Sequence, residues 1–230
     1  MMTLQRHPGP SLLALTLVYL ALMFAGGSKV VVAFHVPHDA ATAVPFVAQN
    51  SAPIRWGSFF EFGSAIPLGI FMAVSTSRLR FLGIRAAGEQ IAVLGGIATP
   101  LMLTGSALAT WSITRPGVAA APGAVAALQA LGFDGGGPGF AVFFGLFVAG
   151  VSVAAGMSRL IPRWLMVLGI VVAAAGELSS LTLLNFTAGY CIPALRFLSI
   201  AWMVGLSFLL PDHLQSGEGS AIAVAAQPQH

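Results

Sequence analysis

The chain has 230 residues, of which 57% are hydrophobic and 7% are charged, and its formal net charge at pH 7 is +3. A typical soluble domain has about 25% charged residues, so this composition excludes a soluble globular protein and a disordered one. It also excludes a nucleic-acid-binding protein, because ten basic residues spread over the whole chain form no basic patch. The composition indicates an integral membrane protein whose immediate partner is the lipid bilayer.

Long apolar windows predict the secondary structure. A helix needs about 20 apolar residues to cross a hydrocarbon core of roughly 30 Å. The first window is longer than the apolar region of a signal peptide, so we expect it to be a spanning helix. The windows are too long and alternate too little for strands of an outer-membrane barrel. In chain order they are 11–36, 56–77, 88–113, 137–157, 164–186 and 193–211.

These windows predict an all-α fold, a polytopic transmembrane helical bundle of about six spans. Residues 1–211 are expected to form a single transmembrane domain. Residues 212–230 are polar and contain Gln and Gly, and we expect a disordered C-terminal tail.

The connections between the windows are of two kinds. Residues 77–85 and 158–163 are short and rich in arginine, which predicts tight basic turns. The connections before the second and fourth windows are longer. Each contains an Ala-rich stretch that predicts a short surface helix, Ala40–Gln49 in the first and Ala124–Leu131 in the second. Gly135-Gly136-Gly137-Pro138 predicts a break in the chain before the fourth span.

The distribution of arginine predicts the orientation in the membrane. Cytoplasmic segments of membrane proteins carry an excess of Lys and Arg. With a cytoplasmic N-terminus, three arginines lie on the outer side, namely Arg55, Arg115 and Arg196. Six lie on the inner side, namely Arg6, Arg78, Arg80, Arg85, Arg159 and Arg163. We therefore expect both termini to be cytoplasmic.

Three segments carry a family resemblance. They are Arg55-Trp-Gly-Ser-Phe-Phe-Glu61, Gly145-Leu-Phe-Val-Ala-Gly150, and Ser158-Arg-Leu-Ile-Pro-Arg163 with Gly169 in the apolar run that follows. In this order, over about residues 11–210, the chain resembles a bacterial family of multi-span membrane proteins of similar length, catalogued as a domain of unknown function. The resemblance implies a multi-pass protein of the bacterial plasma (inner) membrane and implies no activity. Lys29 is not part of the family pattern.

Four ionisable residues fall inside the predicted spans: Lys29, Glu61, Glu177 and Arg196. A charge in the hydrocarbon core costs about 2.5–3.5 kcal/mol on insertion scales, so such a residue usually faces the protein interior and has a partner. Lys29 and Glu61 lie in consecutive spans at depths that agree within about 3 Å, which predicts an ion pair. Glu177 and Arg196 differ in depth by about 9 Å, which a long arginine partly bridges.

These charges support two interpretations. In the first, they line an outward-facing polar cavity of a small transporter or ligand-binding membrane protein, with Arg55, His35 and His38 at its outer rim. In the second, they form satisfied ion pairs that fix the register of the helices in a non-catalytic membrane subunit or regulator.

The sequence gives little support for an enzyme or a metal site. His35 and His38 are three residues apart and Asp39 follows, but Pro37 interrupts the spacing and no second His or Cys cluster occurs, so we expect no metal site. The chain contains neither a G-x-S-x-G elbow nor an H-E-x-x-H motif, and no histidine lies in the middle of a predicted span. We therefore expect no catalytic residues and no cofactor, and an enzyme acting on lipid is a third interpretation that the sequence favours less than the other two.

Overall fold

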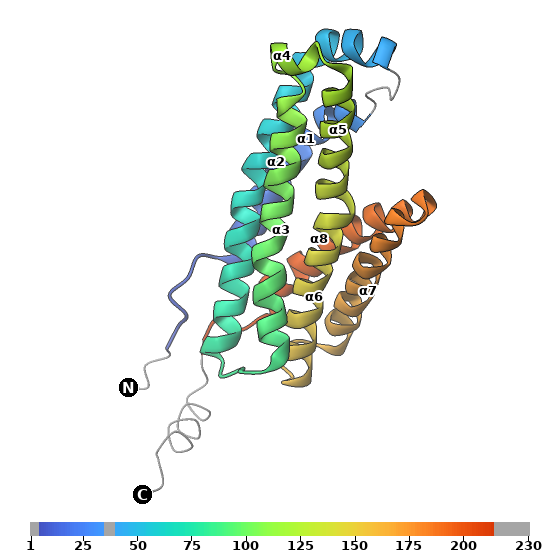
Figure 1. The fold of residues 1–230 in the computed structure, drawn as a ribbon. Coiled ribbons are helices and arrows are strands. Elements are labelled where there is room, and N and C mark those ends of the chain that lie inside the picture. The colour runs from blue at the N-terminus through green and yellow to red at the C-terminus, as the bar shows by residue number, and fades with distance from the viewer. Residues whose placement is uncertain (1–4, 35–39, 214–230) are drawn as a thin grey trace, which may run out of the picture.

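The computed structural model describes residues 5–34 and 40–213 of the chain, with side chains for all of these except 28–34 and 40–41 (Figure 1). The described part is a bundle of long helices without any β-strand, and the only strand-like pairing in it is an isolated bridge between Arg6 and His213. The all-α prediction is therefore confirmed. His35, His38 and nearly all of the predicted tail lie outside the described residues.

The helices follow one another with short connections. The α-helices are α1 (Leu12–Phe34), α2 (Ala40–Phe81), α3 (Ala87–Ser112), α4 (Pro116–Ala119), α5 (Pro122–Asp134), α6 (Phe140–Met157), α7 (Arg163–Ser179) and α8 (Cys191–Leu209). A π-helical turn, η1 (Gly135–Gly139), joins α5 to α6, and two 3₁₀ turns, η2 (Ser180–Leu183) and η3 (Phe186–Tyr190), lead from α7 to α8.

Five helical segments in the described part are long and apolar enough to cross a membrane. They are Thr42–Phe81, Ala87–Ser112, Pro122–Met157, Arg163–Leu183 and Phe186–Leu209. In α1, which has 23 residues, the described apolar stretch Leu12–Gly27 is shorter. These six elements correspond one to one to the six predicted windows.

The helices pack in a closed ring. Helix α1 packs against α2, α2 against α3, α3 against α6, α6 against α7 and α7 against α8, and α8 contacts α1. The largest fully buried side chains fill the centre, among them Phe71, Phe144, Phe147 and Trp202. The Trp202 indole nitrogen donates a hydrogen bond of 2.9 Å to Ser152 Oγ, so this polar atom is satisfied inside the core.

The outer surface of the bundle is apolar. On α3 the side chains of Leu94, Ile97, Leu101 and Leu108 are more than half exposed, whereas the opposite face buries small residues such as Ala92 and Gly95. The same helix thus presents its large side chains outward and its small ones to its neighbours. This arrangement is the one expected of a helix surrounded by lipid, in which small residues allow close helix packing.

The two predicted short surface helices are each part of a longer helical segment. The Ala-rich stretch Ala40–Gln49 is helical, but it is the start of α2, which continues for 42 residues. At 1.5 Å per residue α2 is about 60 Å long, twice the thickness of the hydrocarbon core, so one end of it extends beyond the core. That end packs with α4 and α5 in a second small core of Ala43, Val47, Ile54, Ile113 and Val125.

The Gly-Gly-Gly-Pro segment does not break the chain as predicted. It forms η1, and α5, η1 and α6 together make one continuous helical segment of 36 residues (Figure 1). A π-helical turn accommodates an inserted residue inside a helix and is frequent at functional sites. Packing decides the outcome here, because Gly136 and Gly137 are buried against neighbouring helices, and a Cβ atom at Gly136 would lie 2.5 Å from Ser106 Oγ.

Both ends of the described chain meet at one end of the bundle. The backbone nitrogen of His7 donates a hydrogen bond of 2.7 Å to the carbonyl of Asp212, and Arg6 Nε lies 2.8 Å from Asp212 Oδ2. The α2–α3 and α6–α7 turns lie at the same end (Figure 1). The six arginines assigned to the inner side of the membrane are therefore carried by segments at this end, as an even number of crossings requires.

Candidate functional site

A cavity of about 280 Å³ lies inside the bundle between α1, α2, α3, α8 and the η1 turn. Most of its wall is apolar or glycine. Its polar side chains come from three helices: Tyr19 on α1, Glu61 and Ser64 on α2, and Arg196 on α8. This cavity is the candidate functional site.

Glu61 reaches the cavity from the middle of α2 and is held from α3. The Oγ atom of Ser106 lies 2.8 Å from Glu61 Oε1 and also 2.8 Å from the backbone carbonyl oxygen of Gly132 in α5. Ser106 therefore joins three helices at the cavity wall. A Cβ atom at Gly136 would come within 3.2 Å of Glu61 Oε1, so the glycine allows the π-helical turn to approach the carboxyl group closely.

Arg196 enters from the first half of α8 and is fixed by η1 and α6. Its Nη2 donates a hydrogen bond of 2.6 Å to the carbonyl oxygen of Gly136. Its guanidinium carbon lies 4.6 Å from the ring centroid of Phe140, within the range of a cation–π interaction. Arg196 and Glu61 are close enough to interact electrostatically, but no nitrogen–oxygen distance of 4.0 Å or less joins them.

The predicted pair of Glu177 and Arg196 is wrong. Glu177 lies exposed near the end of α7, and no ion pair involves it among the described residues. The buried face of α7 runs through Val172, Gly176 and Ser179, so the next residue after Gly176 points about 100° away from the core. The structure instead brings Arg196 to the same cavity as Glu61.

The other predicted site residues do not join this cavity. Lys29 is part of α1, but its side chain lies outside the described residues, so its pairing with Glu61 stays a prediction. Arg55 is exposed and lines a different groove, of about 290 Å³, with Phe59, Phe62 and Trp111 between α2 and α3. The rim histidines fall outside the described range, as stated above.

Sequence reasoning missed Ser106, Tyr19 and the carbonyl oxygen of Gly136. Serine inside an apolar helix is a weak signal, because its hydroxyl usually bonds to a carbonyl of its own helix. The three consecutive glycines were a stronger signal. They do not break the chain but allow the close approach of α3 and the two charged side chains.

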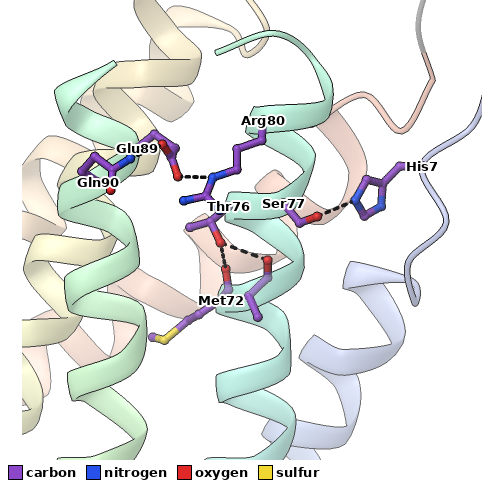
Figure 2. A network of polar contacts seen from close by, with 8 residues as sticks. His7, Met72, Thr76, Ser77, Arg80, Glu89 and Gln90 are labelled. Atoms are coloured by element: carbon purple, nitrogen blue, oxygen red, sulfur yellow. Dashed lines mark hydrogen bonds and ion pairs between the residues drawn. The ribbon is translucent and has the colours of Figure 1, made fainter. Parts of the chain in front are cut away.

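A second polar cluster lies at the end of the bundle where the termini meet (Figure 2). Arg80 Nε lies 2.6 Å from Glu89 Oε1, and Gln90 Nε2 donates to the other carboxylate oxygen at 3.0 Å. Figure 2 shows the His7 ring directed at Ser77, with 2.9 Å between Nε2 and Oγ. These bonds fasten α3 and the N-terminal segment to the end of α2, and the residues do not border the cavity.

Two pKa values are shifted at this end of the bundle, that of Asp212 mainly by hydrogen bonds and that of His7 mainly by burial. Hydrogen bonds from His213 and Arg6 lower the pKa of Asp212, with Arg6 and Arg78 adding electrostatic stabilisation of the carboxylate. Burial and the nearby Arg78 lower the pKa of His7, against the smaller opposing effect of Asp212. Both shifts favour an acidic group that is ionised and a histidine that is neutral at pH 7.

Within the described residues, no group of three or more His, Cys, Asp or Glu side chains could hold a metal ion. Comparison of the chain with family models, with curated proteins and with solved structures finds no match in any of the three. The geometry of the cavity is therefore the basis for the functional conclusion.

Proposed function

We propose that the protein binds a small solute inside the membrane, at the cavity between Glu61 and Arg196, as a small transporter or a ligand-binding membrane protein. One observation carries this proposal. An acidic and a basic side chain from distant parts of the sequence line one cavity of about 280 Å³ without forming an ion pair with each other. Ionisable groups inside a membrane are costly, and they typically mark a binding site or a transport pathway.

The shape of the cavity supports the same function. Ligand sites are mostly apolar pockets with a few convergent polar groups that orient the ligand. Here Met23, Leu103 and Ile192 provide apolar walls beside Glu61 and Arg196. The alternative is a membrane subunit or regulator in which the charges only fix the helices. The hydrogen bonds from Arg196 to Gly136 and between Ser106 and Glu61 support it.

We further propose that both termini face the cytoplasm of a bacterial cell and that the chain lies in the plasma membrane. The arginines at the terminal end support this orientation. Arg196 lies 13 residues before the end of α8 at Leu209, about 20 Å from that end of the helix, which supports a cavity in the outer half of the bilayer. Membership of the bacterial family indicated by the sequence is likewise a proposal.

The experiment is a thermal-stability screen of the full chain in lipid nanodiscs against a library of small solutes. A ligand that binds the folded protein raises its Tm with increasing concentration. We expect at least one solute to raise the Tm of the wild type, and this shift to disappear in Arg196→Gln. It should also disappear in Gly27→Leu, because Gly27 lines the cavity and a Cβ atom there meets no atom within 4 Å.

Two matched controls test the location. Arg55→Gln removes an exposed arginine of another groove, and Gly105→Leu adds the same side chain at an open position of α3 that does not line the cavity. Both should keep the ligand-dependent shift. A shift that survives Arg196→Gln and Gly27→Leu would contradict binding in this cavity. Loss of folding in Arg196→Gln, with no solute shifting the wild type, would favour the structural alternative.

A further inference from the structure

The hydrogen bonds of Ser106 determine where the protons lie at the cavity wall. A serine hydroxyl has one proton to donate and can accept through its lone pairs. Ser106 Oγ has two oxygen neighbours at 2.8 Å, the Glu61 carboxyl oxygen Oε1 and the carbonyl oxygen of Gly132. The carbonyl can only accept, and an ionised carboxylate can only accept as well. One proton cannot make two full hydrogen bonds of this length.

A proton on Glu61 resolves this conflict. The carboxylic acid then donates to Ser106 Oγ, and Ser106 donates its own proton to Gly132. Both contacts become ordinary O–H···O bonds, whose usual length is 2.7–2.8 Å. We propose that Glu61 carries a proton in this conformation and that the cavity, left with the positive charge of Arg196, binds a small organic anion in a proton-dependent manner. The second half of this proposal rests on the solute-binding function proposed above.

Arg196 has the donors that an organic anion requires. A guanidinium has five N–H donors in a planar fork that matches a carboxylate with two parallel hydrogen bonds. Among the described residues, the Arg196 guanidinium donates one hydrogen bond, to the Gly136 carbonyl, and no carboxylate lies within 4.0 Å of it. The apolar walls formed by Met23, Leu103 and Ile192 suit the hydrocarbon part of a small carboxylate.

The groups around Glu61 agree with a neutral carboxyl group. From the packed helices it faces Tyr19 on α1, Ser106 on α3 and Arg196 on α8, and Ser64 of its own helix uses its hydroxyl on the Glu61 backbone carbonyl. Arg196 is the only charged group among these. Lys29 also belongs to α1, and its side chain lies outside the described residues. A Lys29 ion pair would require an ionised Glu61.

Proton release links the two sites. When the Glu61 carboxyl O–H bond breaks, the proton passes to water in the cavity, and Ser106 turns its hydroxyl from Gly132 to the new carboxylate. The negative charge near Arg196 then cancels the charge that holds the anion. Anion binding and proton binding therefore strengthen one another by the same factor.

The test for the proton is infrared spectroscopy of the full chain in nanodiscs, in which a carboxylic acid has a carbonyl stretch that a carboxylate lacks. We expect a carboxylic acid band at neutral pH that disappears in Glu61→Gln and remains in Glu177→Gln, whose side chain is exposed on α7. Gln at position 61 keeps a donor for Ser106, so this variant should fold. In Ser106→Ala the band should move to higher frequency, because the acid loses its acceptor.

The test for the anion is calorimetric titration with acetate, butyrate and benzoate between about pH 5 and about pH 9. Above the titration of Glu61 the affinity of the wild type should fall by up to about tenfold for each pH unit. Glu177→Gln should show the same dependence. In Glu61→Gln the affinity that remains should not vary with pH over this range, because the amide cannot lose a proton.

Each outcome decides one part of the proposal. Absence of a Glu61 band overturns the proton site and is the result that a Lys29–Glu61 ion pair requires. A band without binding of any of the three carboxylates overturns the anion ligand. If the solute screen finds a cavity ligand but carboxylates do not bind, or bind equally at all pH values, this inference fails while the proposed function stands.

Discussion

Oγ of Ser106 and Oε1 of Glu61 are 2.8 Å apart, and this contact connects α3 to α2 at the wall of the cavity. The two residues are 45 positions apart in the sequence. Because Ser106 also contacts the Gly132 carbonyl, it links the carboxyl group to the last turn of α5, which leads into the π-helical turn whose Gly136 carbonyl accepts a hydrogen bond from Arg196. The acidic and the basic side chain of the cavity are thus both positioned by polar contacts to the same helical segment, at Gly132 and at Gly136.

Ser106→Ala should lower the stability of the bundle. The variant leaves the Glu61 carboxyl group and the Gly132 carbonyl without their shared partner, and an unsatisfied buried polar group costs about 1–3 kcal/mol. The free energy of unfolding in mixed detergent micelles measures the loss. The matched control is Ser112→Ala, because Ser112 is on the same helix and its hydroxyl bonds only to the carbonyl of Leu108 at an exposed position. Equal effects of the two variants would contradict the central role of Ser106.

Two glycine substitutions should have opposite effects. A methyl group at Gly136 would lie 2.5 Å from Ser106 Oγ and 3.2 Å from Glu61 Oε1, so Gly136→Ala should destabilise the protein by about 1–3 kcal/mol through overpacking. Gly123 is in the first turn of α5, where a Cβ atom meets nothing within 4 Å. Gly123→Ala should raise the stability by about 0.4–1 kcal/mol, because it restricts the unfolded chain. Thermal unfolding of both variants provides the comparison, and a stable Gly136→Ala protein would argue against the tight approach of η1 to α3.

Acid should release the N-terminal segment from the end of α8. Hydrogen bonds lower the pKa of Asp212 below its ordinary value of 3.8, so its stabilising effect is present above that value and is lost as the pH falls through the lowered pKa. Burial lowers the pKa of His7 below 6.5, so the neutral ring is favoured above that value and stability declines as the pH falls below it. Both groups therefore destabilise the folded contact as the pH falls.

Hydrogen–deuterium exchange of the His7 amide, which donates to the Asp212 carbonyl, measures this release. After correction for the intrinsic rate, protection should decrease in two steps as the pH is lowered. Asp212→Asn should abolish the step at lower pH, and His7→Gln the one at higher pH. Protection that stays constant as the pH falls below 6.5 and then well below 3.8 would show that these groups do not hold the segment.

The orientation can be tested by cysteine labelling in intact cells. Replacing Cys191, the single native cysteine, by Ser provides the background. Gly83 in the α2–α3 turn has a φ of 82°, a conformation that disfavours other residues, so the exposed Arg85 is the better position in this turn. We expect Arg85→Cys to be protected from a membrane-impermeant maleimide. Gly117→Cys, at the opposite end in α4, should be labelled. The reverse pattern would place both termini outside.

The spans of this protein could be predicted from the sequence because apolar length is a local property. Each of the six windows has its helix, and the arginine-rich turns are where they were expected. The extent of the helices could not be predicted. The Ala-rich segment before Pro53 is predicted to be a short separate helix, yet it forms the first part of α2, because Val47 and Ile54 pack against Ile113 and Val125 of distant segments.

The candidate site could likewise be predicted only in part from the sequence. The sequence identified Glu61 and Arg196 as charges within apolar spans, since an ionisable residue there stands out in any window of sequence. The predicted pairing of Arg196 with Glu177 is wrong, because depth along a helix says nothing about direction around it, whereas the pairing of Glu61 with Lys29 stays a prediction. Glu177 lies one residue beyond the buried Gly176 and points outward, and Arg196 reaches the cavity of Glu61 instead.

By itself, the sequence therefore determined that the chain is a membrane-embedded helical bundle, because the scarcity of charge and the length of the apolar windows are summed along the chain. Only the tertiary structure decided that Gly135–Gly139 bends into a π-helical turn, that Ser106 bridges Glu61 and Gly132, and that Arg196 faces the same cavity. Those features depend on how closely helices distant in sequence approach one another, and contacts between side chains at that range set the approach.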